Sequence, residues 1–236
     1  MDKQAVRERV WDELEASGEA RFPFPPHGRI PNFADATAAA DRLTETDAWG
    51  AAETVKANPD SPQRPVRKRA LEAGKTVYMA VPRLRDEQCF RRLDPAAIDD
   101  VDHATTLSGS EAVGEQVGPE AVDAIDLVVS GSVAVTEGGA RIGKGEGYSD
   151  LEYAILTGLG LVDESTPVAT TVHELQVVDD AVPVAAHDVP MDLVVTPDRT
   201  IETGATGRPD GIVWDLLDEE RIAEMPVLER LRAGNQ

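Results

Sequence analysis

The segment that decides the fold of this chain reads GGARIGKGEGYSD and spans residues 138–150. It follows an apolar run, LVVSGSVAV at residues 127–135, whose β-branched residues predict a buried strand. It precedes LEYAIL at residues 151–156, where the apolar positions 151, 154 and 155 fit one face of a helix. The predicted order is therefore a strand, a glycine-rich loop with two cations, and a helix.

A loop of this composition is suited to binding polyphosphate. Glycines let the backbone approach a ligand and direct consecutive N–H groups at it, and the start of a helix adds positive potential. Arg141 and Lys144 would add two full positive charges to the same concavity. The segment is thus predicted to hold phosphate groups.

The spacing of the glycines matches no standard nucleotide motif. Gly138 and Gly143-Lys144 nearly meet the P-loop pattern, but Gly145 stands where a Ser or Thr would bind magnesium. Glycines at 143, 145 and 147 give G-x-G-x-G, whereas the Rossmann fingerprint is G-x-G-x-x-G. Spacing alone leaves open a second interpretation, a glycine-rich hairpin turn with a solvated Lys and Arg.

Composition limits the classes of function. The chain has 236 residues, 44 of them acidic against 23 basic, and a formal charge of −21. This balance argues against a nucleic-acid or anionic-membrane surface, because either would require a basic patch. Ordinary acidic solubility is one explanation; we favour adaptation to a high-salt cytoplasm, where the repulsion between acidic groups is screened. The length favours one domain over residues 1–236.

A single cysteine, Cys89, excludes an intrachain disulfide and any multi-cysteine metal site. No neighbouring base or helix start is evident to activate it, so we interpret Cys89 as a small buried hydrophobe. The N-terminus is charged, and no apolar run approaches the roughly 18 residues of a membrane span. These observations predict a cytoplasmic protein with no membrane contact.

Helical and strand patterns alternate along the chain. Helices are predicted at 2–16, 34–43 and 63–73, strands at 54–57, 76–81, 127–135, 167–172 and 193–195, and a helical tail at 218–236 that is interrupted at Pro226. Strands separated by helices indicate crossover units and an α/β fold with a mostly parallel central sheet. Such sheets bind ligands at the carboxyl ends of their strands, where we place the 138–150 segment.

Residues 141–150, RIGKGEGYSD, resemble the R-[LI]-G-x-G-x-G-Y-Y-D signature of the 5-formyltetrahydrofolate cyclo-ligase family. The start, Lys3 to Arg7, is similar to that family's K-x-x-x-R helix, and residues 182–196 are similar to its closing segment. Four stretches resemble more closely the methenyltetrahydrofolate synthetase domain-containing subfamily: residues 28–33, 55–63, 81–84 and 147–153. The resemblance covers residues 3–203.

The resemblance implies a three-layer α/β fold of the type shared with ribose-5-phosphate isomerases and coenzyme A transferases. It implies a ligase that uses ATP and Mg²⁺ to convert 5-formyltetrahydrofolate into 5,10-methenyltetrahydrofolate through a phosphorylated formyl group. The site residues that it implies are Arg141 and Lys144 as catalytic cations; Lys3, Arg7, Gly143, Lys144, Gly145, Gly147 and Tyr148 around the nucleotide; Asp60 and Tyr148 near the folate; and Asp150 at the magnesium ion.

Each implied role has a structural alternative. Lys3 and Arg7 would otherwise be a solvated pair, Tyr148 a packing residue, and Asp150 a helix cap. Other polar residues receive structural interpretations: His173 and His187 lack metal-ligand spacing. For Arg29, Arg83 and Arg85, contacts to an anionic ligand and surface ion pairs are equally compatible with the sequence.

Two departures from the family keep the function open. Ser149 replaces the second tyrosine of the signature, and the acidic residue that cyclo-ligases place near the pterin has no clear counterpart in residues 58–63, where Asp60 is the candidate. The alternatives are therefore a non-catalytic nucleotide- or folate-binding protein of the same fold, or an ATP-using enzyme that acts on a different pterin. The oligomeric state and the residue that orients N10 of the folate stay open.

Overall fold

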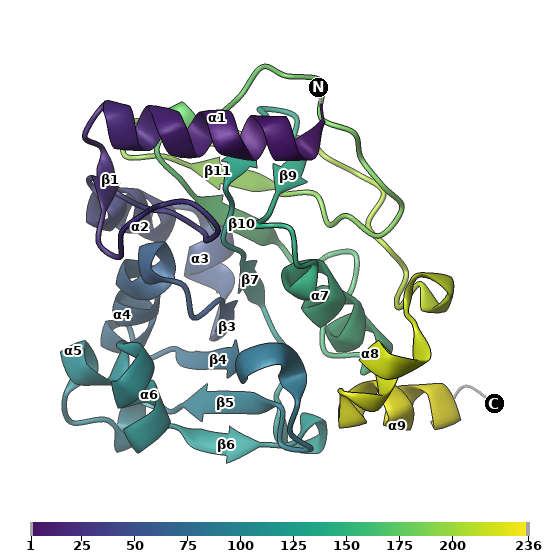
Figure 1. Ribbon diagram of the computed structural model, residues 1–236. Coiled ribbons are helices and arrows are strands. Elements are labelled where there is room, and N and C mark those ends of the chain that lie inside the picture. Colours follow the sequence, from purple (N-terminus) through teal and green to yellow (C-terminus); the bar gives the residue numbers. More distant parts are fainter. Residues whose placement is uncertain (1, 235–236) are drawn as a thin grey trace.

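The computed structural model describes residues 2–234 (Figure 1). Its helices are α1 Lys3–Ala16, α2 Ala36–Thr44, α3 Asp47–Ala51, α4 Arg64–Glu72, α5 Val101–Ala104, α6 Leu107–Val113, α7 Tyr148–Gly158, α8 Glu219–Ala223 and α9 Pro226–Gly234. Its strands are β1 Ala20–Arg21, β2 Asn32–Phe33, β3 Thr54–Ala57, β4 Thr76–Ala80, β5 Phe90–Leu93, β6 Glu115–Val117, β7 Leu127–Val129, β8 Ala134–Val135, β9 Arg141–Ile142, β10 Val168–Thr171, β11 Leu193–Val195 and β12 Thr200–Glu202.

The central sheet has eight strands in the order β12-β11-β10-β7-β3-β4-β5-β6. The five inner strands from β11 to β4 are parallel, and β12, β5 and β6 pair antiparallel at the two edges. This arrangement confirms the predicted mostly parallel α/β sheet. The sequence patterns located the parallel strands, but they did not indicate β5, β6 or β12.

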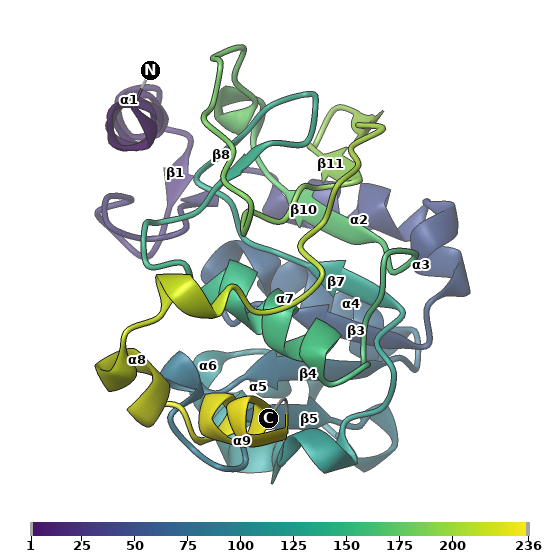
Figure 2. The ribbon, with the colours of Figure 1, turned by 90° about the vertical axis from the view of Figure 1, so that its right-hand side faces the viewer.

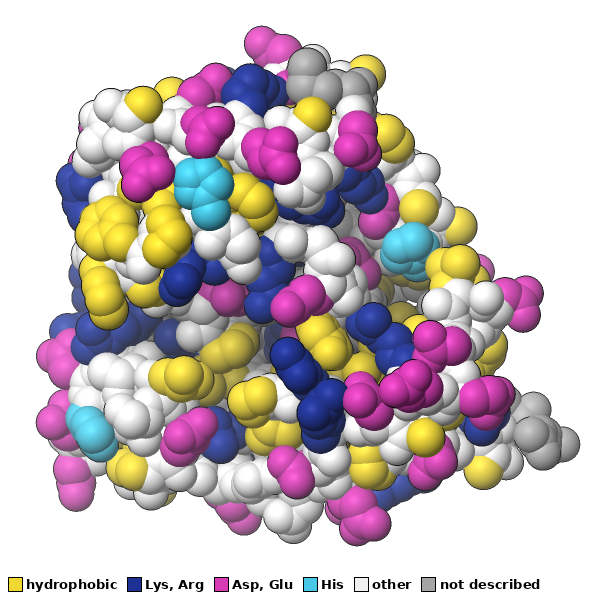
Figure 3. Space-filling view, viewed as in Figure 1, with side chains coloured by type: hydrophobic (Ala, Val, Ile, Leu, Met, Phe, Trp, Pro, Cys, Tyr) yellow, Lys and Arg dark blue, Asp and Glu magenta, His cyan; other side chains and the backbone are white. Residues whose placement is uncertain are grey.

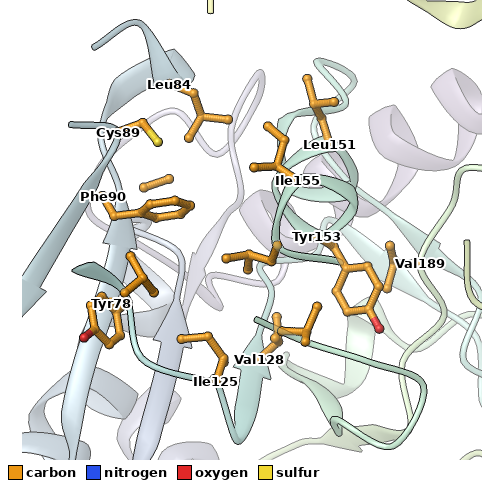
Figure 4. Packing of buried hydrophobic residues seen from close by; sticks show 14 of the residues in the cluster. Tyr78, Leu84, Cys89, Phe90, Ile125, Val128, Leu151, Tyr153, Ile155 and Val189 are labelled. Carbon is orange, nitrogen blue, oxygen red and sulfur yellow. The ribbon is translucent and has the colours of Figure 1, made fainter. Parts of the chain in front are cut away.

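Helices cover both faces of this sheet and give three layers (Figure 2). On one face α2, α3 and α4 pack over a cluster that includes Val55 and Ala57 of β3. On the other face α7, α8 and α9 enclose a larger cluster, shown in Figure 4, where Leu151 and Ile155 of α7 lie opposite β4 and β5. Because side chains alternate along a strand, Lys56 faces α7 while its two neighbours face α2 and α4.

Cys89 belongs to the cluster beneath α7 and is fully buried. Burial raises the pKa of its thiol to about 12, so the thiolate form is disfavoured. The interpretation of Cys89 as a small buried hydrophobe is confirmed.

The order of the strands reverses between β3 and β7. After β3 the chain turns toward α4 on one face, and after β7 it leads to α7 on the other face. The two connections diverge, so a crevice opens at the carboxyl ends of β3 and β7. This position is where an open α/β sheet binds its ligand.

The predicted strand at 127–135 is wrong as a single element. β7 ends at Val129, and the chain continues without regular structure to β8, which forms a two-stranded hairpin with β9. Gly131 lies in this break. A Cβ added to it would lie 2.9 Å from Cγ2 of Ile30, so the backbone approaches Ile30 more closely than a residue with a side chain would allow. The segment 138–150 therefore contains part of a hairpin turn, β9 and a loop at 143–147. The hairpin interpretation is confirmed for Gly138 and Gly139, and phosphate binding by the loop at 143–147 stays a prediction.

The C-terminal tail follows the prediction, because α8 ends before Pro226 and α9 begins at that proline. Residues 235 and 236 of the predicted tail, and residue 1, lie outside the described residues. Among residues 2–234, no helix combines the length and the apolar character that crossing a bilayer requires.

The two adjacent glycines of the β8–β9 turn provide a test of this hairpin. Gly139 has φ +84°, and a Cβ there would lie 2.4 Å from the carbonyl oxygen of Met191, whereas a Cβ on Gly138 would meet nothing nearer than Thr136 Oγ1 at 3.7 Å. We expect Gly139→Ala to lower the free energy of unfolding by about 2–4 kcal/mol, the sum of left-handed strain and overpacking. Gly138→Ala is the matched control and should change it by less than about 0.5 kcal/mol. Urea denaturation of both variants measures the difference, and equal effects would contradict the hairpin geometry.

Candidate functional site

A cavity of about 670 Å³ opens at the reversal of strand order, between the loops that follow β3, β4 and β7 and the loop at 143–147. Its lining includes Asn58, Asp60 and Ser61 after β3, Val81 to Arg83 after β4, Gly131 after β7, Lys144, Glu146 to Asp150 and Glu152, together with Phe22, Arg29 and Arg64. Figure 3 shows Lys and Arg side chains gathered along the hollow that crosses the middle of this face. The cavity is therefore positively lined in a chain of strongly negative net charge.

Helix α1 lies against the loop at 143–147. Arg7 Nε donates a hydrogen bond to the carbonyl oxygen of Gly143 at 2.7 Å. Its guanidinium carbon also lies 3.5 Å from the position that a Cβ on Gly145 would take, and Gly145 has φ +110°. Lys3 pairs with Asp188 at 2.6 Å. The structure thus places Arg7 in contact with the loop, whereas Lys3 is paired with the carboxylate of Asp188.

Arg141 lies beneath this loop, where it is buried. Its Nη1 donates to the carbonyl oxygen of Gly131 at 2.9 Å, and its Nη2 donates to Asp150 Oδ2 at 2.5 Å. Asp150 Oδ1 accepts a hydrogen bond from the backbone N–H of Val189 at 3.1 Å. Burial alone would raise the pKa of Asp150, but the Arg141 guanidinium outweighs it and holds that pKa below its usual range.

This geometry differs from the open loop predicted from the sequence. Arg141 is not a free cation, because its charge is matched by Asp150, and both carboxylate oxygens of Asp150 already accept hydrogen bonds. Asp150 does not cap α7 either, since Gly147 occupies the cap position without a side-chain hydrogen bond. Residues 2–234 contain no group of three or more His, Cys, Asp or Glu side chains that could hold a metal ion. A magnesium ion here would take most of its ligands from phosphate oxygens and water.

The other side chains near the loop pair within it or contact Arg221 of α8. Lys144 Nζ lies 2.8 Å from a carboxylate oxygen of Glu146, and Arg221 Nη2 donates to the carbonyl oxygen of Glu146 at 2.9 Å. The Arg221 guanidinium also lies 4.9 Å from the centre of the Tyr148 ring. Tyr148 is half-buried and lines the cavity between this cation and the interior.

Asp60 lies in the cavity wall opposite this loop. Burial raises the pKa of its carboxyl group, and the Lys144 ammonium opposes that shift. The loop that carries it is held by Arg67, which donates to the carbonyl oxygens of Asp60 at 3.1 Å and Thr105 at 3.0 Å. Burial lowers the pKa of Arg67 to about 10.

Sequence reasoning missed a buried ion pair between Lys56 of β3 and Glu152 of α7. Lys56 Nζ also donates to Asn58 Oδ1 at 2.9 Å, and Asn58 Nδ2 lies 3.4 Å from Ser149 Oγ. A signal was present, since each member of the pair is a single charge within an apolar run, TVKA at 54–57 and LEYAIL at 151–156. The departure noted at Ser149 is thus in contact with the altered segment after β3.

The three arginines left open by the sequence divide into two groups. Arg29 and Arg83 line the cavity, and within residues 2–234 neither has a carboxylate within salt-bridge distance. Arg85 pairs with Glu224 at 2.9 Å on the surface. His173 Nδ1 accepts a hydrogen bond from the backbone N–H of Leu175 at 3.2 Å, as a cap of the short helix Glu174–Gln176.

Taken together, these features define an α/β protein of three layers with a polar cavity at the reversal of strand order, the place where open sheets of this kind bind their ligands. The NMR structure of Aquifex aeolicus 5,10-methenyltetrahydrofolate synthetase superposes with a TM-score of 0.56 at 18% identity, and covers 87% of this chain and 95% of that chain. The model of the 5-formyltetrahydrofolate cyclo-ligase family matches residues 1–197. The chain belongs to the 5-formyltetrahydrofolate cyclo-ligase family.

Relatives of greater identity are longer proteins. The methenyltetrahydrofolate synthase domain-containing protein of Mus musculus is 45% identical over 239 residues, which are 98% of this chain and 63% of the mouse protein. The Homo sapiens protein of the same name is 40% identical over 243 residues, which are 100% of this chain and 63% of the human protein. The chain therefore spans less than two thirds of the length of these relatives.

The Arg141–Asp150 pair generates a prediction about acid stability. Asp150→Asn leaves the buried Arg141 charge unpaired, so the free energy of unfolding at pH 7 should fall by about 3–5 kcal/mol. Folding lowers the pKa of Asp150, so its contribution is complete above the ordinary aspartate pKa of about 4 and is lost as the pH falls through the lower folded value.

Urea titrations between pH 7 and pH 3 measure this effect. The difference between the wild type and Asp150→Asn should shrink below about pH 4. Asp99→Asn, at an exposed aspartate, is the control and should change the unfolding free energy by less than about 0.5 kcal/mol. A difference independent of pH would mean that the carboxylate charge is not what stabilises this contact.

Proposed function

We propose that this protein is an ATP- and Mg²⁺-dependent ligase that cyclises 5-formyltetrahydrofolate to 5,10-methenyltetrahydrofolate. The observation that carries the proposal is the position of a glycine loop with Arg7 and Lys144 at the edge of the cavity where the strand order reverses. Family membership supports the substrate class. The cavity volume of about 670 Å³ falls within the range of small-molecule sites.

The reaction has two displacements. The formyl oxygen at N5 attacks the γ-phosphorus of ATP and ADP leaves. N10 then attacks the activated formyl carbon, loses its proton, and the carbon–oxygen bond breaks as inorganic phosphate departs. The protein contributes positioning and neutralisation of charge, which supply most of the catalysis in phosphoryl transfer.

The described side chains divide these tasks. Lys144, on the cavity wall, would neutralise charge on the transferred phosphoryl group, and Arg7 would contact the phosphates from α1 with Lys3 further along that helix. Arg141 would act as a positioning residue, since its guanidinium contacts Asp150 and the backbone at Gly131, beyond the end of β7. Backbone N–H groups from Gly143 to Gly147 would cradle the phosphates. Tyr148 and Asp60 would contact the folate from opposite walls.

Magnesium would supply charge neutralisation at the phosphates, and Asp150 would accept hydrogen bonds from its water ligands. We expect the protein to work in the cytoplasm at high salt, given 44 acidic against 23 basic residues.

A second candidate is a non-catalytic protein that binds a nucleotide or folate in the same cavity. One observation favours it, namely that Ser149 and the altered segment after β3 are in contact and rebuild one wall of the cavity together. Both candidates predict binding, and only turnover separates them.

The test is an absorbance assay for the methenyl product, with Mg-ATP and 5-formyltetrahydrofolate at high KCl and a control without ATP. Lys144→Ala and Arg7→Ala should each lower ATP affinity and kcat/KM about 10- to 100-fold, the loss of one charged contact to phosphate. Lys68→Ala, a lysine on α4 whose partners are Glu72 and Asp102, is the matched control and should leave both unchanged. Tight binding of ATP and folate without product would favour the non-catalytic candidate. Unchanged ATP affinity in both loop variants would overturn the assignment of the loop.

A further inference from the structure

The inner wall of the cavity contains a charged pair where the sheet is otherwise apolar. Lys56 pairs in register with Tyr78 of β4 on one side and with Val128 of β7 on the other, and both neighbours belong to the hydrophobic cluster under α7. Lys56 is 1% exposed. An apolar residue would continue this row, so the lysine needs an explanation beyond packing.

Glu152 of α7 provides the partner of Lys56 and is 7% exposed. Ser149 precedes Glu152 by three residues, so both lie on one side of the helix. Lys56 Nζ donates to Asn58 Oδ1 at 2.9 Å, and Ser149 Oγ donates to Ser130 Oγ at 3.2 Å. The ion pair is thus enclosed by hydrogen bonds from β3, β7 and α7.

A buried ion pair stabilises a fold little, because desolvation offsets the attraction between the charges. This pair is not sealed in the core, however, since Glu152 lines the cavity. One carboxylate oxygen, Oε2, accepts from Lys56, and the other, Oε1, accepts from no described residue. Glu152 therefore presents one anchored oxygen and one oxygen that is free for a ligand.

We propose that Glu152, anchored by Lys56, is the residue that selects the 2-amino-4-oxopyrimidine edge of the pterin. This inference rests on the proposed function, because it assumes a reduced folate in the cavity. That edge carries two neighbouring donors, the 2-amino group and N3–H, and a carboxylate is an acceptor with two oxygens. A charge-assisted pair of hydrogen bonds follows, with Lys56 compensating the negative charge.

Asp60 is the competing carboxylate, because it also lines the cavity. Its carboxylate has no ion-pair partner among residues 2–234, and it lies on a loop. Glu152 lies on a helix and is fixed by a buried cation, so its position is better defined before a ligand arrives. The rigid carboxylate is the better candidate for discrimination between ligands.

The experiment measures equilibrium binding of two ligands, 5-formyltetrahydrofolate and its 2-oxo analogue, in which oxygen replaces the 2-amino group. Wild-type protein should prefer the 2-amino compound by about 10- to 100-fold, because the analogue places an acceptor against a carboxylate. Lys56→Met with Glu152→Gln removes both charges together, so neither is left unpaired. In this double variant the preference should disappear or reverse, since a glutamine amide can donate to the 2-oxo group.

Three controls make the outcome decisive. Asp60→Asn should change the affinity for both ligands by the same factor and so keep the preference, since Asp60 is proposed to contact the folate away from the 2-amino group. Loss of the preference in Asp60→Asn with its retention in the double variant would assign recognition to Asp60. ATP affinity reports folding and should be the same in the double variant and the wild type. If the double variant does not fold, Lys56→Gln with Glu152→Gln replaces it, because this pair also removes both charges and keeps polar groups beside Asn58. Equal binding of both ligands to the wild type would overturn this inference and leave the proposed function intact. Binding of neither ligand would overturn the proposed function itself.

Discussion

The contact between Arg141 and Asp150 is the constraint on which the site depends. The Arg141 guanidinium joins β9 to the start of α7 through its hydrogen bond to Asp150. A second hydrogen bond from the same guanidinium fixes the backbone at Gly131, beyond the end of β7. Asp150 in turn holds the backbone at Val189. Because the loop at 143–147 begins after β9 and ends at α7, these contacts set both of its ends. A flexible glycine loop can only be a defined phosphate site if its ends are fixed, so in the proposed function this internal ion pair would support binding without touching the ligand.

The charges of the whole chain also bear on the site. A chain with a net charge of −21 repels anions on average, so an anionic ligand needs a local reversal of potential. Many surface arginines outside the cavity are paired with carboxylates, as Arg85 is with Glu224. At the cavity, Arg29 and Arg83 have no such partner within residues 2–234, and Arg64 donates to Thr105 Oγ1 and the Asp102 carbonyl oxygen. The cavity thus holds cations without a carboxylate partner in a chain of strongly negative net charge, and its walls focus their potential.

The sequence contained more of the fold than of the site. Parallel strands at 54–57 and 193–195 could be predicted because buried strands are apolar and are followed by turn or helix signals. β5 could not be predicted, because Arg91 and Arg92 interrupt the apolar pattern of a buried strand. The end of β7 at Val129 could not be predicted either, because serine and glycine, as at 130 and 131, also occur within strands. The glycine loop was found from composition. The burial of Arg141 was not, because the sequence does not show that Asp150 lies within hydrogen-bond distance of it.

The departures from the family signature become a single feature once the contacts are known. Taken separately, Ser149 replaces the second tyrosine of the family signature, and residues 58–63 lack a clear counterpart of the family's acidic residue near the pterin. In the structure Asn58 reaches Ser149, and Lys56 reaches both Asn58 and Glu152, so the changed residues contact each other across β3 and α7. A small side chain at 149 leaves room for Asn58, and Asn58 satisfies a buried ammonium that would otherwise have one partner fewer. Lys56, Asn58 and Ser149 all have partners, whereas the buried side chain of Gln63, at the end of the altered segment, has no hydrogen-bond partner within the described residues. The contacts among Lys56, Asn58 and Ser149 join the two departures into one local network, and Glu152 is the carboxylate of this network on the helix side of the cavity.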